Sequence, residues 1–472
     1  MIAFNLISRR NVNADIAKLE KSIAVLPLIN DSPDESNAYF INGIMENILD
    51  NLCKIQNLTV IARTSVEQYR NAPKNVTEIA KELKVSFILE GSGQKYEDRI
   101  RLIVQLINGE NGKHIWSNQY NRELKDIFSI QSEVSQVIAS ELKAIITPEE
   151  KHIIEFVPTN NLTALDCYLR ALEEHNKFNE NQTDYKEGEN ELERAILLYQ
   201  LTLEYDSSYA QAYVGLAKAY RDKYYNKTYF KDDFLDSTMT LANIALSYNS
   251  KLEEAYKIRA DYYYDYGMYN EALKEYDLVL KINPNYWRAY TDRANIYIQL
   301  GDCISLIKST QKAIKLNRGK ELPRLLRRQG SNFDYLEMED IADGYYLHAL
   351  SLDHDTLTYY NELTNRERND YKRGKILFIE DIMKVNKMLE VDSTLDGGSL
   401  YRIAYANSVL GNHKEAYKYW SEYAKRTKGM GLQLISVSHR VGYAYWQAGY
   451  KEEARRYSNK NTYNRSLLSN KG

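Results

Sequence analysis

The spacing of large and small apolar residues between Glu253 and Asn317 repeats after 34 positions. Four positions recur in consecutive units: Tyr256 and Tyr290, Ala260 and Ala294, Tyr263 and Tyr297, Gly267 and Gly301. Within each unit the pattern predicts two amphipathic helices, and the glycine would end the first of them in a left-handed conformation. A fixed period of this length predicts helix pairs that stack into a solenoid.

The same pattern extends in weaker form over residues 161–465, where we expect about eight helix pairs. Small residues are expected where two helices cross closely: Ala260, Ala294, Ala404 and Gly442 on first helices, and Ala272, Ala416 and Ala454 on second helices. Pairs are expected over 166–205, from 210 onward, over 253–286, 287–320, 323–355 and 356–394, and twice after 400. Residues 466–472 are expected to form a frayed tail.

Residues 22–147 show a different pattern, in which short apolar runs alternate with amphipathic segments. We expect strands at 22–28, 58–62, 87–91, 99–106 and 114–120, and helices at 37–52, 76–83 and 126–146. The order β-α-β-α-β-β-β-α predicts a small three-layer-like α/β domain, followed by the all-α superhelical solenoid. Residues 1–21 are expected to be a lead-in segment with a short helix at 14–21.

The repeat resembles the tetratricopeptide repeat (TPR) family, most clearly in 253–317 and 400–457. This resemblance implies a right-handed superhelix whose first helices line a concave groove. Such arrays hold peptides or partner domains and are not catalysts. The Lys/Asn clamp that some members use for a C-terminal carboxylate is not reproduced, because Asp261 stands where an Asn would be needed.

Several segments of 22–146 resemble the FlgO-like or TolB-N-like domain of bacterial regulatory proteins: Ser22–Pro27, Tyr39–Ile44, Val60–Ser65, Ile88–Ser92 and Ile127–Gln131. In adenylate-cyclase-associated and transcriptional-regulator relatives this domain precedes TPRs and often follows a cyclase or DNA-binding domain and a membrane helix. Only 21 residues precede it here, so we do not carry cyclase or DNA-binding activity over to this chain. The apolar stretch Ile2–Ile7 is a candidate remnant of a membrane helix.

Composition and charge narrow the classes of partner. The chain has 62 basic and 65 acidic side chains, a balance that gives no electrostatic footprint for nucleic acid. The three cysteines lie far apart, so we expect buried thiols and no disulfide framework. No apolar run reaches the ~20 residues that span a bilayer, and we therefore expect a cytoplasmic protein. The 41 tyrosines suit the many half-buried seams of stacked helices.

We find no motif for catalysis, cofactor binding or metal binding, and predict none of these. No GxSxG elbow is present, and the seven histidines lack ligand spacing. Residues 90–95 are the only phosphate-loop-like stretch, but they lack the GxxxxGK[ST] spacing and are interpreted as a strand connection. The alternative is a small-ligand or peptide site shared with Arg63–Ser65. The pair Glu149 and Glu150 is interpreted as a solvated helix start.

Two sets of residues are candidates for partner binding. By register, the groove should be lined by Lys257, Asp261, Tyr264, Arg288, Thr291 and Asn295, and in the last two units by Tyr401, Tyr405, His439, Tyr443 and Trp446. A basic run comprises Lys308, Lys312, Lys315, Arg318, Lys320, Arg324, Arg327 and Arg328. We interpret this run as a solvated outer face, and the alternative is a surface for an acidic partner or a phosphate backbone.

The sequence therefore predicts a non-enzymatic scaffold or regulator in bacterial signalling, which binds a partner protein or peptide in the groove. The alternative is a fragment of a membrane-linked signalling or transcriptional regulator. Its cyclase or DNA-binding effector would then lie upstream or on another chain. The sequence does not specify the partner or the signal.

Overall fold

The computed structural model describes residues 21–454, apart from 72–73, 181–184, 227–233, 337, 357, 360–361, 364–399, 402, 405–406, 409–410 and 430–437. The predicted helices at 14–21 and 356–394 lie wholly or largely outside the described residues. The chain divides into two compact units between Asn332 and Phe333.

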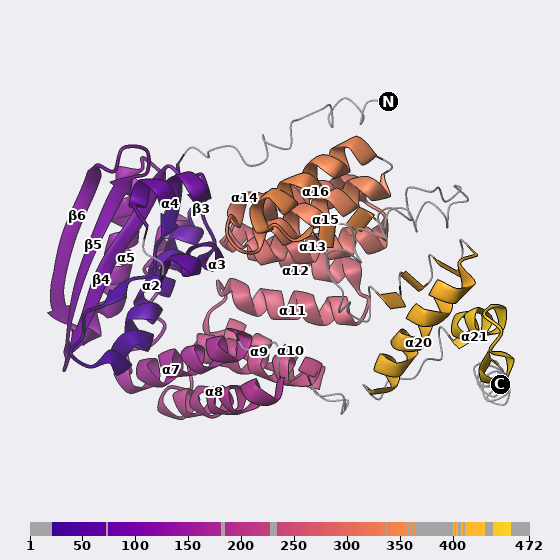
Figure 1. The fold of residues 1–472 in the computed structure, drawn as a ribbon. Helices are drawn as coiled ribbons and strands as arrows, with labels where there is room; N and C mark the ends of the chain where they lie inside the picture. The colour runs from indigo at the N-terminus through magenta and orange to yellow at the C-terminus, as the bar shows by residue number, and fades with distance from the viewer. Residues whose placement is uncertain are drawn as a thin grey trace. The chain divides into compact units, whose positions relative to one another are not determined.

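The first unit begins with an α/β region, residues 21–154, built on one mixed sheet (Figure 1). Its strands are β1 (Ser22–Val25), β2 (Ile29–Asn30), β3 (Thr59–Val60), β4 (Phe87–Tyr96), β5 (Arg99–Asn108) and β6 (His114–Glu123). The sheet order is β3-β1-β4-β5-β6, and β2 also pairs with β4. β1 is parallel to β3 and β4, whereas β4, β5 and β6 form an antiparallel meander. This topology confirms the predicted order of the major elements.

Helices cover the sheet on both faces, which confirms the three-layer expectation. α2 (Ala38–Cys53) and α5 (Ile127–Glu141) pack on one face, because alternate strand residues such as Ile23, Val25 and Leu89 point to it. α3 (Arg63–Val66) and α4 (Val76–Leu83) pack with Ala24 and Ile88 on the other face. Three short 3-10 helices complete the region: Glu35–Asn37, Glu67–Tyr69 and Leu124–Asp126.

Three local predictions in this region were wrong. β4 continues through 90–95, so this stretch is a strand and not a connection. α5 ends at Glu141, four residues short of Ile145, which is exposed and not part of an apolar face. An additional helix, α6 (Pro148–Ile154), follows, and its Thr147–Glu150 capping box turns the Glu150 carboxylate inward. Glu150 is buried and accepts a hydrogen bond from the Gln56 amide, so it is not solvated.

Antiparallel helix pairs follow, as the 34-residue period predicted (Figure 1). In the first unit they are α7 (Leu162–Glu180), α8 (Tyr185–Tyr205), α9 (Ala210–Asn226), α10 (Phe234–Tyr248), α11 (Glu253–Asp265), α12 (Tyr269–Ile282), α13 (Trp287–Leu300) and α14 (Cys303–Leu316). α15 (Leu322–Tyr335) runs across the division between the units. Gly267 and Gly301 have φ of 72° and 70°, which confirms the predicted left-handed ends of first helices.

The second unit contains α16 (Glu339–Asp353), α20 (His413–Gly429) and α21 (Ser438–Gln447). Trp420 is fully buried there and packs edge-on against Tyr401 and Tyr423. Ala404, Ala416 and Ala454 are buried small residues, as the crossing positions require. The second unit therefore repeats the packing logic of the first.

The α/β region and α7 share one hydrophobic core. Leu165 and Leu169 of α7 join the cluster formed by α2, α5 and the sheet. Gly43 on α2 permits this approach, because a Cβ at that position would lie 2.5 Å from Leu169 Cδ2. At the same seam the Tyr39 hydroxyl donates a hydrogen bond to Asp166, and burial together with this bond raises the Tyr39 pKa. The first repeat helix is thus a structural part of the α/β region.

The loop after α12 inserts one asparagine into the edge of the sheet. Asn285 is 6% exposed, and its Oδ1 accepts a hydrogen bond of 3.0 Å from the Val60 amide of β3. Its Nδ2 donates to the carbonyls of Cys53, at 2.9 Å, and Leu58, at 3.0 Å. The side chain therefore makes the backbone contacts that a neighbouring strand would make at the β3 edge.

The loop after α14 docks on the next segment of the α/β region. The Leu316 carbonyl accepts from the Ala62 amide at 2.9 Å. Asn317 donates to the Thr64 hydroxyl at 3.0 Å and accepts from the Ser65 hydroxyl at 3.2 Å. The loop therefore contacts the residues that follow the carboxyl end of β3. These include Arg63–Ser65, for which the sequence analysis kept a small-ligand or peptide site as an alternative.

The two earlier loops contact the α/β region and its linker. After α8, Asp206 accepts a hydrogen bond from Thr159 in the linker, and after α10, Lys251 pairs with Glu149 of α6 at 2.6 Å. Four consecutive inter-repeat loops thus contact the α/β region or its linker. We call these loops the docked edge of the repeats and define it by Asp206, Lys251, Asn285 and Asn317.

Candidate functional site

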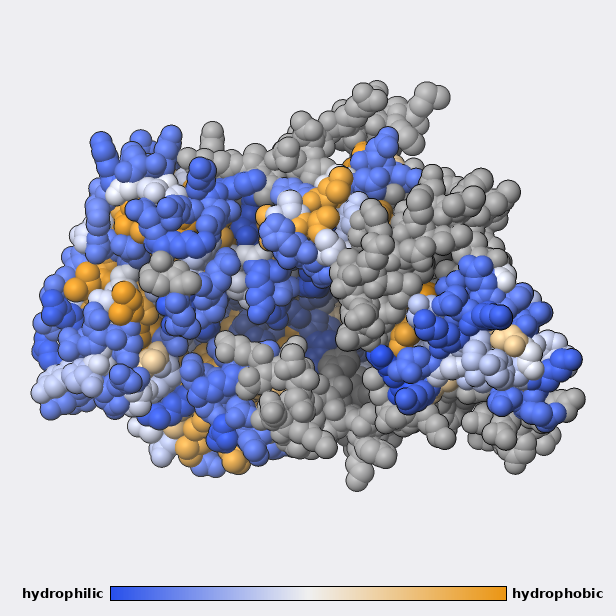
Figure 2. Space-filling model, viewed as in Figure 1, coloured by the Kyte–Doolittle hydropathy of each residue, from blue (hydrophilic) through white to orange (hydrophobic). Residues whose placement is uncertain are grey.

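A row of charged side chains runs across the first helices of consecutive repeats. The period brings Lys257 and Asp261 of α11 into register with Thr291 and Asn295 of α13, because 34 residues separate each pair. We call this surface the polar face and define it by Lys218, Arg221, Lys257, Asp261, Asp292, Asn295 and Arg328. Over the stretch of α11, hydrophilic residues prevail in the space-filling view (Figure 2).

Ion pairs join the polar face from α9 to α13. Arg221 of α9 pairs with Asp261, which also accepts from Lys257 at 2.8 Å. Lys257 in turn lies 3.2 Å from Asp292 of α13. The Tyr276 hydroxyl of α12 donates to the second oxygen of Asp261 at 2.5 Å. Because each first helix supplies a charge to its neighbour, the face is continuous across the repeats.

Arg328 of α15 ends this face in a different way. Its guanidinium donates to Asn295 Oδ1 at 2.7 Å and to the Thr291 carbonyl at 3.2 Å, and both of these acceptors are neutral. Burial lowers the Arg328 pKa, an effect that the Asp292 carboxylate only partly offsets. A half-buried cation held by neutral acceptors can still take up an anionic or carbonyl group from a ligand.

Burial also lowers the pKa of the Lys257 ammonium, because the attraction of Asp292 does not fully compensate for lost hydration. Two carboxylates flank the Lys257 ammonium, Asp261 at 2.8 Å and Asp292 at 3.2 Å. The polar face therefore offers fixed, partly dehydrated charges of both signs, which suits hydrogen bonding to a peptide backbone and its side chains.

The structure places the predicted groove residues of the first unit as follows. Lys257, Asp261, Thr291 and Asn295 lie together on the polar face. Arg288 is exposed and lies over the Trp287 ring at 5.4 Å, away from this hydrogen-bonded set. Sequence reasoning missed Arg221 and Asp292, although both lie on first helices at positions whose charge could have been read from the register.

In the second unit the predicted groove residues divide into three groups. The Tyr401 ring packs inward on Trp420 and is part of the core. Tyr443 and Trp446 are exposed, and Lys451 lies 5.5 Å from the Trp446 ring. Tyr405 and the side chain of His439 lie outside the described residues.

The predicted basic run does not form one solvated face. Lys308, Lys312 and Lys320 are exposed, and Arg324 pairs with Glu321 at 2.7 Å. Arg318, however, is 5% exposed at the docked edge, where its amide donates to Ser65 Oγ. Arg328 belongs to the polar face. The solvated interpretation was thus wrong for Arg318 and Arg328, because α14 ends at the α/β region and α15 turns back toward α13.

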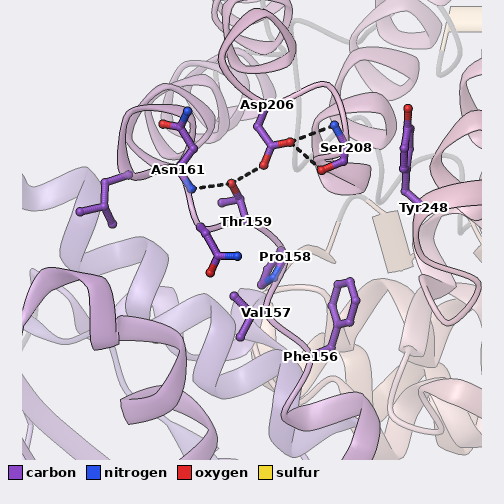
Figure 3. A pocket seen from close by; sticks show the side chains of 10 residues that line it. Phe156, Val157, Pro158, Thr159, Asn161, Asp206, Ser208 and Tyr248 are labelled. Atoms are coloured by element: carbon purple, nitrogen blue, oxygen red, sulfur yellow. Dashed lines mark hydrogen bonds between the residues drawn. The ribbon is translucent and has the colours of Figure 1, made fainter.

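A shallow pocket of 700 Å³ lies where the linker meets the docked edge (Figure 3). It is lined by residues 156–162 together with Asp206, Ser208 and Tyr248. Burial raises the Asp206 pKa, but hydrogen bonds from Ser208 and Thr159 outweigh this effect and hold it below the ordinary value. Because these bonds tie Asp206 to the linker, we interpret the pocket as part of the joint between the α/β region and the repeats.

The buried histidine of the first repeats is engaged in packing. His175 of α7 is buried, and its Nε2 lies 2.7 Å from Asp222 of α9. Its ring packs edge-on against Tyr199 of α8, inside the core of the first repeats. Within the described ranges, no group of three or more His, Cys, Asp or Glu side chains could hold a metal ion. The three cysteines are free thiols, and Cys167 is buried.

Comparison with known proteins gives partial matches. No family model matches the chain. A curated Rhizobium meliloti (strain 1021) protein named "Putative adenylate cyclase 3" is 37% identical over 158 residues, which is 34% of this chain and 27% of that protein. The chain thus spans about a quarter of the length of this relative. None of the helices in the described parts of the chain is long and apolar enough to cross a membrane.

Among solved structures, a tetratricopeptide repeat protein from Parabacteroides merdae ATCC 43184 is 15% identical, with a TM-score of 0.40. The match covers 58% of this chain and 99% of that one. YrrB, described as a TPR protein with an unusual peptide-binding site, is 18% identical with a TM-score of 0.29, over 40% of this chain and 97% of its own. MamA is 19% identical with a TM-score of 0.30, over 37% and 96%.

Proposed function

We propose that this chain is a non-enzymatic scaffold that binds a protein segment along the polar face of its repeats. The observation that carries the proposal is Arg328, a half-buried guanidinium bonded to Asn295 and Thr291 beside a charge network that spans three helices. Repeats that served only as a spacer would not need dehydrated charges on this face, since burying them costs free energy.

The distribution of the remaining charges supports the same face. The docked edge is already occupied by the α/β region of the same chain, through Asn285 and Asn317. The second helices carry exposed charges such as Lys274, which are ordinary for a protein surface. The first helices therefore remain the surface of the repeats that is both polar and pre-organised.

A peptide selection tests the proposal. Random peptides displayed on phage are panned against the full chain, and enriched peptides are remeasured by fluorescence anisotropy. Arg328→Gln removes the charge but keeps a hydrogen-bonding group, and we expect it to weaken binding about tenfold or more. Lys274→Ala, on a second helix, is the matched control and should leave the affinity unchanged. Failure to enrich any peptide, or equal binding by Arg328→Gln, would contradict the proposal.

A second candidate function is favoured by the curated relative. The 158-residue match to part of a protein named as an adenylate cyclase is what we would expect if this chain corresponded to the non-catalytic portion of a longer regulator. The resemblance of residues 22–146 to FlgO-like domains points in the same direction. In this view the α/β region and repeats receive a signal and pass it to an effector.

The genomic sequence before the Met1 codon separates the two candidates. An open reading frame that continues upstream into a hydrophobic helix and a cyclase or helix-turn-helix domain would support the regulator. The same effector on a neighbouring gene would also support it. An intergenic region with no effector gene nearby would contradict the regulator and leave the scaffold as the remaining candidate.

A further inference from the structure

The two edges of the α/β sheet are treated differently. β3 forms one edge, and Asn285 of the repeats covers it by bonding to Val60 and Leu58. β6 forms the other edge and is the outermost strand of the sheet in Figure 1. Within the described residues, β6 pairs with β5 alone. An open edge of this kind is a template for another strand.

The hydrogen bonds around β6 show which backbone groups face outward. The Leu124 amide donates to the Asp98 carbonyl at 2.7 Å, just beyond the pair Arg99–Glu123. In an antiparallel ladder the bonded residues alternate, so the even-numbered residues of β6 bond to β5 and the odd-numbered residues face away. The Gln119 amide agrees with this assignment, because its partner is the Asn118 side chain and not β5.

Two of the usual protections of an edge strand, proline and lysine, are missing from β6. The strand is ten residues long and contains neither proline nor lysine. Its register slips once, beside Ile115, and Trp116 to Glu123 then run regularly against β5. Ser117, Gln119 and Asn121 are exposed, so a strand could approach their outward amides and carbonyls.

We propose that β6 pairs with β6 of a second copy of this chain, antiparallel about a twofold axis at Gln119. This register places outward-facing residues opposite each other, Ser117 with Asn121 and Gln119 with itself, as backbone bonding requires. It also places Arg122 opposite the Trp116 ring on the helix-covered side, where a cation–π contact forms twice. The contact is isologous, with the same patch on both chains.

Self-complementarity favours a second copy over a foreign strand. Arg122 is the only ionisable side chain between Trp116 and Arg122 other than Tyr120, and in this register no like charges are opposed. Moving the axis to Asn118 would place Arg122 opposite His114, and moving it to Tyr120 would lose the Trp116 contact. The Arg122 side chain is 40% exposed while paired with Glu133, so it can reach across the seam.

Position 119 permits a sharp test, because the axis places each Gln119 opposite its own copy. The full chain is examined by sedimentation equilibrium over a wide range of concentrations. We expect wild type to dimerise, and Gln119→Lys and Gln119→Glu each to weaken the dimer by about tenfold or more through like-charge repulsion. An equimolar mixture of the two variants should dimerise again. Gln299→Lys and Gln299→Glu, at an exposed site on α13, are the matched controls and should match wild type.

Gln119→Pro provides a second, independent variant. Its ring removes an outward amide that β5 does not use and blocks an approaching strand, so the fold should persist while the dimer is lost. Circular dichroism checks the fold. A wild type that stays monomeric at every concentration overturns the proposal. So does a dimer that survives Gln119→Pro, or a mixture of charged variants that fails to reassociate.

Discussion

The helical repeats have two edges, and the same 34-residue period produces both. At the turns inside each repeat, Gly267 and Gly301 are left-handed, and a Cβ added to either would have no neighbour within 4 Å. At the loops between repeats, Asn285 and Asn317 are buried against the α/β region. One edge is free and defined by backbone conformation, whereas the other is docked and defined by side-chain hydrogen bonds.

The docked edge also shows that a recurring residue need not have a recurring role. Asn283 and Asn317 occupy the same position in consecutive units. Asn283 stays within the repeats, where it donates to Glu253 at 3.0 Å and accepts from the Asn285 amide. Asn317 bonds to Thr64 and Ser65 of the α/β region instead. The neighbour that each loop meets, and not the period, decides what the asparagine does.

Asn285→Ala should produce the largest loss of stability, because Asn285 makes three hydrogen bonds to backbone groups of the α/β region. The substitution leaves the Val60 amide and two carbonyls unsatisfied, and we expect a loss of about 3 kcal/mol in the free energy of unfolding. Urea denaturation measures the loss. Asn270→Ala, at an exposed site on α12, is the control. An equal loss in both variants would contradict the claim that the hydrogen bonds of Asn285 stabilise the fold.

Alanine substitution of one glycine at each edge tests whether the two edges are independent. A Cβ on Gly319 would lie 2.3 Å from Ser65 Cα, so Gly319→Ala should cost about 2 kcal/mol by overpacking. Gly301→Ala meets no atoms and should cost about 1 kcal/mol through its left-handed backbone alone. Hydrogen exchange separates the mechanisms: only Gly319→Ala should deprotect residues 62–66. Faster exchange there in Gly301→Ala would show that the edges are not independent.

The smallest effect is expected from pH at the start of α11. Burial raises the pKa of Glu253 above 4.5, and Asp50 and Glu254 add to the shift, although Lys54 and Asn283 oppose it. The folded state therefore holds a proton that the unfolded state releases, and stability falls as pH rises above 4.5.

Glu253→Gln removes this titration while keeping an oxygen for Asn283. At neutral pH it should be more stable than wild type by about 1 kcal/mol, and near pH 4 the two should coincide. Urea denaturation at a series of pH values gives the comparison. A difference that does not change with pH would mean that folding does not shift the Glu253 pKa.

The architecture could be predicted from the sequence because helix and strand packing require particular residue types at regular spacings. Ala260 and Ala294 must be small where helices cross, and the strands of the sheet must alternate, so both patterns could be read before the structure. The register also placed Lys257, Asp261 and Asn295 on one face. In the structure Lys257 pairs with Asp261, and Asn295 accepts a hydrogen bond from Arg328. Whether a partner binds there stays a prediction.

The docked edge could not be predicted in this way, since its contacts join residues far apart in the sequence, by 225 and 252 positions for Asn285–Val60 and Asn317–Ser65. In the sequence Asn285 resembles an ordinary turn residue. Its structural role comes from the hydrogen bond that it accepts from Val60, 225 positions away. Arg318 looks like one more charge in a basic run, and its burial depends on where α14 ends. The early end of α5 was missed because Ile145 continues the apolar spacing although the helix has stopped.

The docked edge has a mechanical consequence for the repeats. A stack in which each pair touches only its neighbours bends and stretches like a spring, and a ligand that straightens or tightens it must supply the elastic energy. Here the loops after α8, α10, α12 and α14 are anchored at four points on a compact body. We therefore expect the distance between Lys257 and Arg328 to change little when a ligand binds, so that binding loses less configurational freedom than it would on an unanchored array.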